Sequence, residues 1–354
     1  VPATLLAAKL AELAPGDLNH VIFTCGGSTA VDSSYRLIQY YQNCRGKPEK
    51  KHIISRKNSY HGSTYLSMSI GGKAGDHPPE FDFISDTIHH ISCPNYYRAP
   101  QGLTEAQYLS FLLEELEQTI LRIGADKVAA FYAEPVLGAG GVIVPPQGYH
   151  QGTFEICRKY DVLYVSDEVV TAFGRLGHWF ASKDVFAIEP DIIITAKGLT
   201  SGYQPLGACI YSDRIHQLIS EPGHGRCFAH GFTYSGHPVA CAAALATLDI
   251  YQRDSLFEQA IALEDYWQDA LFSLRDLPNV LDIRAIGLVG GVQLAANSQG
   301  PGKRGFQVFE QCFHNDLMVR VTGDTLAMSP PLIVTKAQID TLVEKLADAI
   351  RQAD

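Results

Sequence analysis

The sequence has no hydrophobic run long enough to cross a membrane. Its longest apolar stretches, such as VIVPP at residues 142–146 and DIIIT at residues 191–195, are far shorter than the roughly 20 residues that a membrane-spanning helix needs. The opening residues, VPATLLAAKLAELAPG, contain neither a basic segment nor a small-residue cleavage site. We therefore expect no targeting signal there and no membrane partner.

Positive charge is also scarce. Lysine and arginine number 28 against 38 aspartates and glutamates, which gives a net charge of −10. A general nucleic-acid-binding surface needs a basic excess, so we expect no nucleic-acid partner. Neither nucleotide-binding fingerprint is present, because the sequence has no G-x-x-x-x-G-K-[ST] and CGGSTAV at residues 25–31 is not G-x-G-x-x-G. The composition favours chemistry on small molecules and counts against a nucleotide-dependent enzyme.

Cysteine and histidine never occur in the spacings that bind metals. The eight cysteines include no C-x-x-C pair, and the thirteen histidines form neither H-E-x-x-H nor a zinc-type Cys/His pattern. A chain of 354 residues can also bury a large core without disulfides. We predict reduced cysteines, a cytoplasmic protein and no metal site. The cysteines are Cys25, Cys44, Cys93, Cys157, Cys209, Cys227, Cys241 and Cys312.

Apolar, β-branched segments alternate with amphipathic ones over the first 250 residues. This pattern predicts an α/β fold, in which a mostly parallel central sheet is covered by helices on both faces, as the large domain at residues 1–250. We expect one long loop that ends near residue 103. The expected strands are 19–24, 52–56, 128–135, 162–169, 191–197 and 207–212, and the expected helices lie within 3–13, 25–41, 59–72, 105–124, 151–161 and 237–253.

The pattern changes in the last hundred residues. A long helix is followed by short strands, another helix, a strand and a final helix, which predicts a smaller C-terminal α+β domain at residues 251–354. The expected helices are 255–276, 304–315 and 336–352, and the expected strands are 279–287, 289–295 and 318–322.

Three unusual clusters follow directly on expected strands. Asp167 and Glu168 come after VLYVS, and Lys197 comes after DIIITA. The turn Gly26-Gly27-Ser28 comes after VIFT. Open parallel sheets bind ligands at the carboxyl ends of their strands, so these groups should share one edge. An ammonium group is costly at the end of a buried strand. Lys197 therefore either extends to water or takes part in chemistry.

Each cluster alone has an ordinary structural explanation. An Asp-Glu pair is more often a loop acid or a helix cap, a glycine turn is often only a tight turn, and Tyr60 in NSYHGST could simply be a core residue. Together, an amine, a carboxylate, a phosphate-binding helix N-terminus and an aromatic face match the needs of one cofactor. That cofactor is pyridoxal 5'-phosphate.

The wording of these motifs resembles a known family. YVSDEVVTAFGRLGHWFA and EPDIIITAKGLTSGYQPLGA are similar to the class III (omega) aminotransferases of the fold-type I pyridoxal-phosphate enzymes. The resemblance covers nearly the whole chain, although family members normally carry a further segment before the position of Val1. Other matching segments are IFTCGGSTAVDSSYR, SYHGSTY, AEPVLGAGGVIVPPQGY, HGFTYSGHPVACAAALATL and VRVTGDTLAMSPPLIVT.

The resemblance implies catalytic and cofactor-binding roles. Lys197 would form the internal aldimine and then act as the base, while Asp167 would pair with the pyridinium nitrogen. Tyr60 and Val169 would pack on opposite faces of the ring, and Gly27 with Ser28 would hold the phosphate. In the family the turn commonly reads Ser-Gly-Ser-Glu-Ala-Asn, whereas residues 26–31 here read Gly-Gly-Ser-Thr-Ala-Val.

The same resemblance implies partners around this centre. Thr233 would reach the phosphate from a second subunit, which implies a homodimer with active sites at the interface, or a tetramer built from such dimers. His61 would contact the cofactor beside Tyr60, and Glu134 would support it from behind.

The residues expected around the substrate depart from one branch of the family. Leu137, Ala139 and Ala327 stand where enzymes that use 2-oxoglutarate typically carry Gln, Glu and Arg. Arg320 in VRVTGD instead resembles the mobile arginine of pyruvate-dependent omega-transaminases, which pairs with a substrate carboxylate. The alternative for Arg320 is an ordinary surface ion pair.

The resemblance thus implies an enzyme that moves an amino group from an amine or omega-amino acid to an oxo acid. Pyruvate is the expected acceptor, and the route is ping-pong. The same residues would also serve a decarboxylase or an aminomutase, because the pocket decides which bond breaks. A non-catalytic binding protein on this scaffold would need neither Lys197 nor Asp167.

Overall fold

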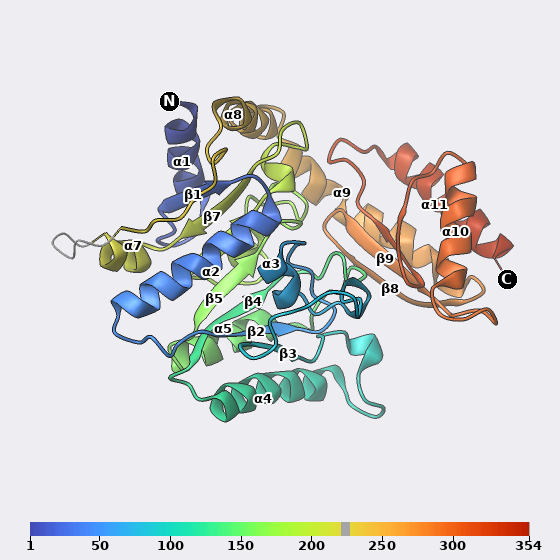
Figure 1. Ribbon diagram of the computed structural model, residues 1–354. Coiled ribbons are helices and arrows are strands. Elements are labelled where there is room, and N and C mark those ends of the chain that lie inside the picture. Colours follow the sequence, from blue (N-terminus) through green and yellow to red (C-terminus); the bar gives the residue numbers. More distant parts are fainter. Residues whose placement is uncertain (221–226, 354) are drawn as a thin grey trace.

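The computed structural model describes residues 1–220 and 227–353. Figure 1 shows a larger α/β part, which contains both the N-terminus and the central sheet, beside a smaller part formed by the C-terminal residues. Within the described residues, no helix combines the length and apolar character that a membrane crossing requires.

A seven-stranded sheet forms the centre of the larger part. Its order is β1-β7-β6-β5-β4-β2-β3. β7 is antiparallel to β1 and to β6, and the other pairs are parallel, which confirms the mostly parallel sheet. The strands are β1 (His20–Thr24), β2 (His52–Arg56), β3 (Ile88–Ile91), β4 (Val128–Ala133), β5 (Leu163–Asp167), β6 (Ile192–Thr195) and β7 (Gly207–Tyr211).

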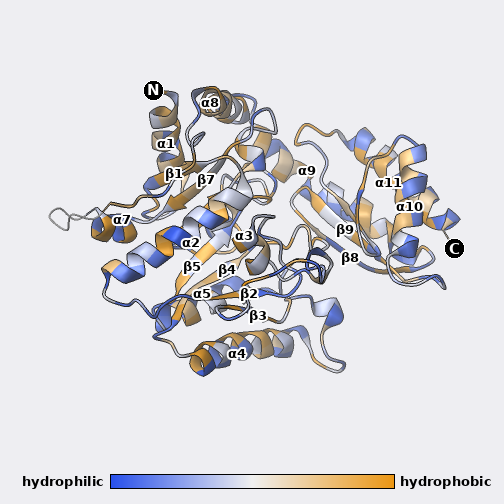
Figure 2. Ribbon diagram, viewed as in Figure 1, coloured by the Kyte–Doolittle hydropathy of each residue, from blue (hydrophilic) through white to orange (hydrophobic). Residues whose placement is uncertain are grey.

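Both faces of the four strands β4 to β7 are buried, which explains why these strands are mostly apolar. In β6, Ile192 and Ile194 pack in the core beneath α2, while Ile193 packs on the opposite face beneath α1 and α8. Figure 2 shows hydrophobic colour along the central strands, whereas α4 has one apolar and one polar side. The helices are α1 (Pro2–Leu13), α2 (Gly27–Cys44), α3 (Tyr65–Ile70), α4 (Glu105–Ile123), α5 (Tyr149–Lys159), α6 (Ala181–Asp184), α7 (Asp213–Ile219) and α8 (Pro238–Arg253).

The smaller part is a four-stranded antiparallel sheet in the order β10-β11-β9-β8. One face packs on three helices in a core that contains Trp267, Val292 and Leu326. The other face carries Val289 and Ala327, which pack against the larger part. Its elements are α9 (Leu256–Phe272), β8 (Val280–Ile286), β9 (Val289–Leu294), α10 (Lys303–His314), β10 (Arg320–Thr322), β11 (Thr325–Met328) and α11 (Lys336–Gln352).

The predicted fold class is confirmed, but several short elements differ from the predictions. The expected loop that ends near residue 103 contains the edge strand β3, whose sequence IHHI carries histidines on both faces. β11, α6 and α7 were not expected either, because four to seven residues give too little periodicity to recognise. The domain boundary that we predict after residue 250 falls within α8, and it stays a prediction.

Candidate active site

One large cavity lies where the two parts meet. It has a volume of about 1100 Å³ and opens at the carboxyl ends of β5 and β6, with β10 and β11 of the smaller sheet as another wall. The strand ends at which the rule for open parallel sheets predicts ligand binding therefore line this cavity. Every predicted site residue except Thr233 lines this cavity, namely Gly27, Ser28, Tyr60, His61, Glu134, Asp167, Val169, Lys197 and Arg320.

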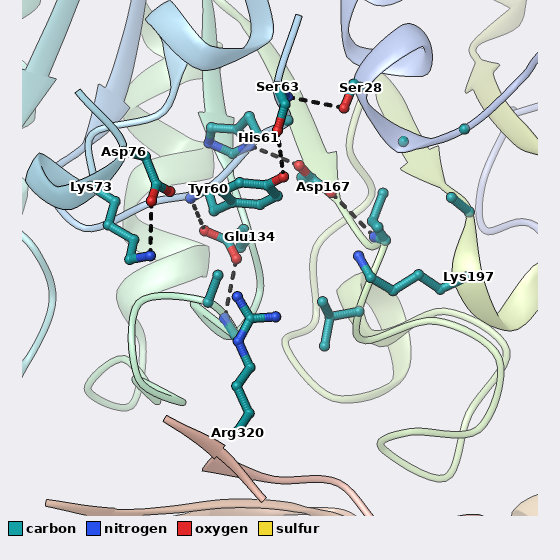
Figure 3. A pocket seen from close by; sticks show the side chains of 18 of the residues that line it. Ser28, Tyr60, His61, Ser63, Lys73, Asp76, Glu134, Asp167, Lys197 and Arg320 are labelled. Atoms are coloured by element: carbon teal, nitrogen blue, oxygen red, sulfur yellow. Dashed lines mark hydrogen bonds and ion pairs between the residues drawn. The ribbon is translucent and has the colours of Figure 1, made fainter. Parts of the chain in front are cut away.

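Lys197 lies two residues after the end of β6 and extends into the cavity (Figure 3). Its φ of 33° lies in the left-handed region, which costs energy for a residue with a side chain and is typical of functional sites. Among the described residues, no hydrogen bond or ion pair holds its Nζ atom. Desolvation lowers the pKa of this amine, the negative charges of Asp167 and Glu134 oppose the shift, and the charge of Arg320 adds to it. The neutral form, which is the nucleophile and the base, is therefore more accessible than in an ordinary exposed lysine.

Asp167 and His61 form a buried pair at the end of β5. Asp167 Oδ2 lies 2.7 Å from His61 Nδ1, and because a carboxylate only accepts, the histidine nitrogen donates. Asp167 Oδ1 accepts the N–H of Val169 at 3.2 Å. Two fixed donors thus orient the carboxylate in the cavity wall. The sequence placed His61 at the cofactor but did not predict this pair.

Glu134 connects two backbone segments of the wall. It is buried, and its Oε1 accepts the N–H of Tyr60 at 2.9 Å, while Oε2 accepts the N–H of Gly138 at 3.1 Å. Burial raises the pKa of this carboxyl, and the neighbouring charge of His61 opposes that shift. Glu134 therefore fixes the backbone of Tyr60 relative to the loop that follows β4.

The N-terminus of α2 also lines the cavity, through Gly27 and Ser28. Gly26 caps it without a side-chain hydrogen bond, and its first turn contains no acidic residue. The first N–H groups of a helix have no intrahelical partner and attract an anion. Ser28 Oγ accepts the N–H of Ser63 at 3.1 Å. A Cβ on Gly62 would lie only 2.6 Å from Ser28 Oγ, so glycine is required where these two turns meet.

The smaller sheet supplies the remaining wall. Arg320 and Ala327 line the cavity from β10 and β11, and Ala139 lines it from the loop after β4. Leu137 is fully buried and does not line it. Sequence reasoning missed Lys73 and Asp76, which line the cavity from the larger part, form an ion pair of 3.0 Å and carry no recognisable motif.

Thr233 does not reach this cavity within its own chain. It is exposed in the segment before α8, next to Tyr234, which is 68% exposed. This position neither tests nor contradicts its expected role in a partner subunit.

These groups have the chemistry that pyridoxal phosphate requires. A helix N-terminus without acidic residues suits a phosphate, an oriented carboxylate suits a ring nitrogen, and an unpaired amine suits an aldehyde. An aromatic ring and an aliphatic side chain in the cavity lining suit the two faces of a planar ring. The described cavity residues therefore fit this cofactor.

Comparison with known proteins identifies the family. The chain matches the family described as "Aminotransferase class-III" over residues 1–350, so it belongs to the class III aminotransferases. Enzymes of this class depend on pyridoxal phosphate, which is therefore the cofactor of this chain.

Similar proteins with assigned activities are also aminotransferases. A putrescine–pyruvate aminotransferase of Pseudomonas aeruginosa is 40% identical over 352 residues, which are 97% of this chain and 75% of the relative. An omega-aminotransferase of Caulobacter vibrioides is 39% identical and covers 98% of this chain and 79% of the relative. A mitochondrial gamma-aminobutyrate transaminase 1 of Oryza sativa subsp. indica is 40% identical over 362 residues, 100% of this chain and 70% of the relative.

The fold is also similar to that of a solved transaminase structure. The omega transaminase from Pseudomonas jessenii in complex with PMP superimposes with a TM-score of 0.95 at 39% identity and covers 99% of this chain and 78% of that chain. The protein is thus an enzyme with the fold-type I architecture and aminotransferase activity.

Proposed function

We propose that this aminotransferase moves an amino group from an amine or omega-amino acid to pyruvate by a ping-pong route. The observation that carries the proposal is the position of Arg320. Its side chain enters the same cavity as Lys197 from the opposite part of the molecule (Figure 3). A guanidinium group there can bind the carboxylate of a small oxo acid whose carbonyl carbon lies near Lys197.

The cofactor supplies an electron-accepting ring that stabilises negative charge at the substrate carbon. Lys197 Nζ would be its attachment point and would hold and move the proton of the reacting carbon. Asp167 would keep a proton on the ring nitrogen, and its contact with His61 orients its carboxylate for that role. Tyr60 and Val169 would pack on the two faces of the ring.

Phosphate binding falls to Gly27 and Ser28 at the N-terminus of α2. Thr233 would add a contact from the partner subunit of a homodimer. Tyr203 and Tyr234 are 80% and 68% exposed, and tyrosine side chains are enriched at protein–protein interfaces. We also propose a cytoplasmic location, supported by the unpaired cysteines of the described part.

A comparison of two oxo-acid acceptors, pyruvate and 2-oxoglutarate, tests the proposed function. The purified protein is loaded with pyridoxal phosphate and given 4-aminobutyrate or putrescine with either pyruvate or 2-oxoglutarate. We expect a kcat/KM at least about tenfold higher with pyruvate, because Ala139 and Ala327 offer no second charge for a second carboxylate. Alanine and glutamate are quantified separately. Equal or faster formation of glutamate would refute pyruvate specificity, and stoichiometric release of carbon dioxide would indicate a decarboxylase.

Arg320→Ala separates the two half-reactions. Loss of a charge-assisted contact should raise the KM for pyruvate about 10- to 100-fold. The half-reaction with a simple amine that carries no carboxylate should change by less than about threefold, because Arg320 has no group to bind on that substrate. Arg351→Ala, on the exposed side of α11, is the matched control. Equal losses in both half-reactions would contradict the role of Arg320.

A further inference from the structure

Four residues form one row across the smaller sheet. Arg284 of β8 pairs with Gly291 of β9, Gly291 pairs with Ala327 of β11, and Ala327 pairs with Arg320 of β10. Residues directly opposite each other in antiparallel strands present their side chains on the same face. Two arginines therefore flank two small residues on the face that looks toward the larger part.

The loop after β4 lies across this row. Arg284 donates from Nη2 to the carbonyl of Gly141 at 2.8 Å and from Nε to the carbonyl of Val142 at 3.1 Å. A Cβ on Gly291 would lie 3.0 Å from the same Gly141 oxygen. Glycine in the row thus allows the close approach, and Arg284 holds the loop in place.

Backbone strain shows that this loop is held by its surroundings. Val142 has a φ of 54°, an outlier for a β-branched residue, and Gly141 has a φ of 114°. Such conformations persist only where neighbouring contacts enforce them, and they gather at functional sites. Arg284 binds the carbonyl groups of both residues.

The loop also contacts the strand that carries Arg320. Thr322 lies two residues after Arg320, on the same face of β10, and donates to the carbonyl of Ala139 at 3.3 Å. Ala139 and Val142 line the cavity together with Arg320, whereas Arg284 does not line it. A shift of the loop would therefore change the cavity beside Arg320.

We propose that Arg284 is a positioning residue for carboxylate recognition. It holds the loop of residues 138–142 against the smaller sheet and so fixes the wall beside Arg320 without touching the substrate itself. This inference rests on the proposed binding of the substrate carboxylate by Arg320.

The test uses steady-state kinetics of the loaded enzyme with two acceptors, pyruvate and an uncharged aliphatic aldehyde. Arg284→Met keeps the bulk of the side chain but removes its donors, and it should raise the KM for pyruvate about tenfold. The KM for the aldehyde and both kcat values should stay within about twofold. Gly291→Ala places a Cβ against the carbonyl oxygen of Gly141 and should also raise the KM for pyruvate. This second variant tests the position of the loop even if Arg284→Met has a folding defect. Arg351→Met is the matched control.

A double-mutant cycle with Arg320→Ala completes the test. If Arg284 acts through Arg320, the effect of Arg284→Met on the KM for pyruvate should disappear in the Arg320→Ala background. Additive effects, or a parallel loss with both acceptors, would overturn the inference. If Arg320→Ala raises the KM and Arg284→Met does not, this inference alone fails. If Arg320→Ala has no effect, the proposed carboxylate site fails, and the inference fails with it.

Discussion

Lys197→Met is expected to lower kcat by at least about 10⁴-fold, because it removes the amine that we propose attaches the cofactor and moves the proton. Methionine keeps most of the side-chain volume, so the cavity wall stays intact. Single-turnover assays with saturating cofactor and amine measure the loss. Lys183→Met, an exposed lysine on α6, is the control and should retain full activity. A Lys197→Met variant within about tenfold of the wild type would exclude Lys197 as the catalytic base.

The same substitution should leave the fold intact. Desolvation lowers the pKa of Lys197 in the folded state, so protonation of this amine opposes folding. The cost is fully present below the folded-state pKa and disappears as the pH rises to the ordinary lysine value of about 10.4. Without cofactor, Lys197→Met should therefore be at least as stable as the wild type at pH 7, with a difference that shrinks at higher pH. Thermal unfolding at several pH values measures it.

Asp167→Asn should lower kcat by about 10²- to 10³-fold while the cofactor stays bound. Asparagine keeps the shape of the side chain and can still accept from His61 Nδ1, but it has no negative charge to keep a proton on the ring nitrogen. The rate of the amine half-reaction and the absorbance of bound cofactor are measured together.

The conservative variant Asp167→Glu gives the matched comparison, since it keeps the charge and changes only the reach of the side chain. It should retain more activity than Asp167→Asn. The opposite order would show that shape, and not charge, governs this position.

The place of the candidate site could be predicted because it depends on where the buried parallel strands end. The strands before Asp167 and Lys197 are mostly apolar, which identifies buried parallel strands without any knowledge of their partners. Their carboxyl ends share one edge, so the amine and the carboxylate had to lie near each other. The resemblance added the roles of these two residues.

Contacts between distant segments could not be predicted in this way. His61 and Asp167 are 106 positions apart, and Arg284 and Val142 are 142 apart. No local pattern encodes such pairs. Glu134 is similar, because its partners are backbone N–H groups that any residue could supply. These contacts arise from tertiary packing and became visible only in the structure.

Two short strands could not be predicted for a different reason. β3 and β11 have four residues each, and the histidines of β3 look polar in sequence. Backbone pairing with a neighbouring strand stabilises them more than their own side chains do. Tertiary context therefore decided these elements against their local sequence preference.

The central claim, that Lys197 binds the cofactor covalently, has a direct test. The wild-type protein is loaded with pyridoxal phosphate, reduced with borohydride, digested and mapped by mass spectrometry. We predict a single phosphopyridoxyl group on Lys197. Labelling scattered over exposed lysines, with Lys197 unmodified, would contradict the account.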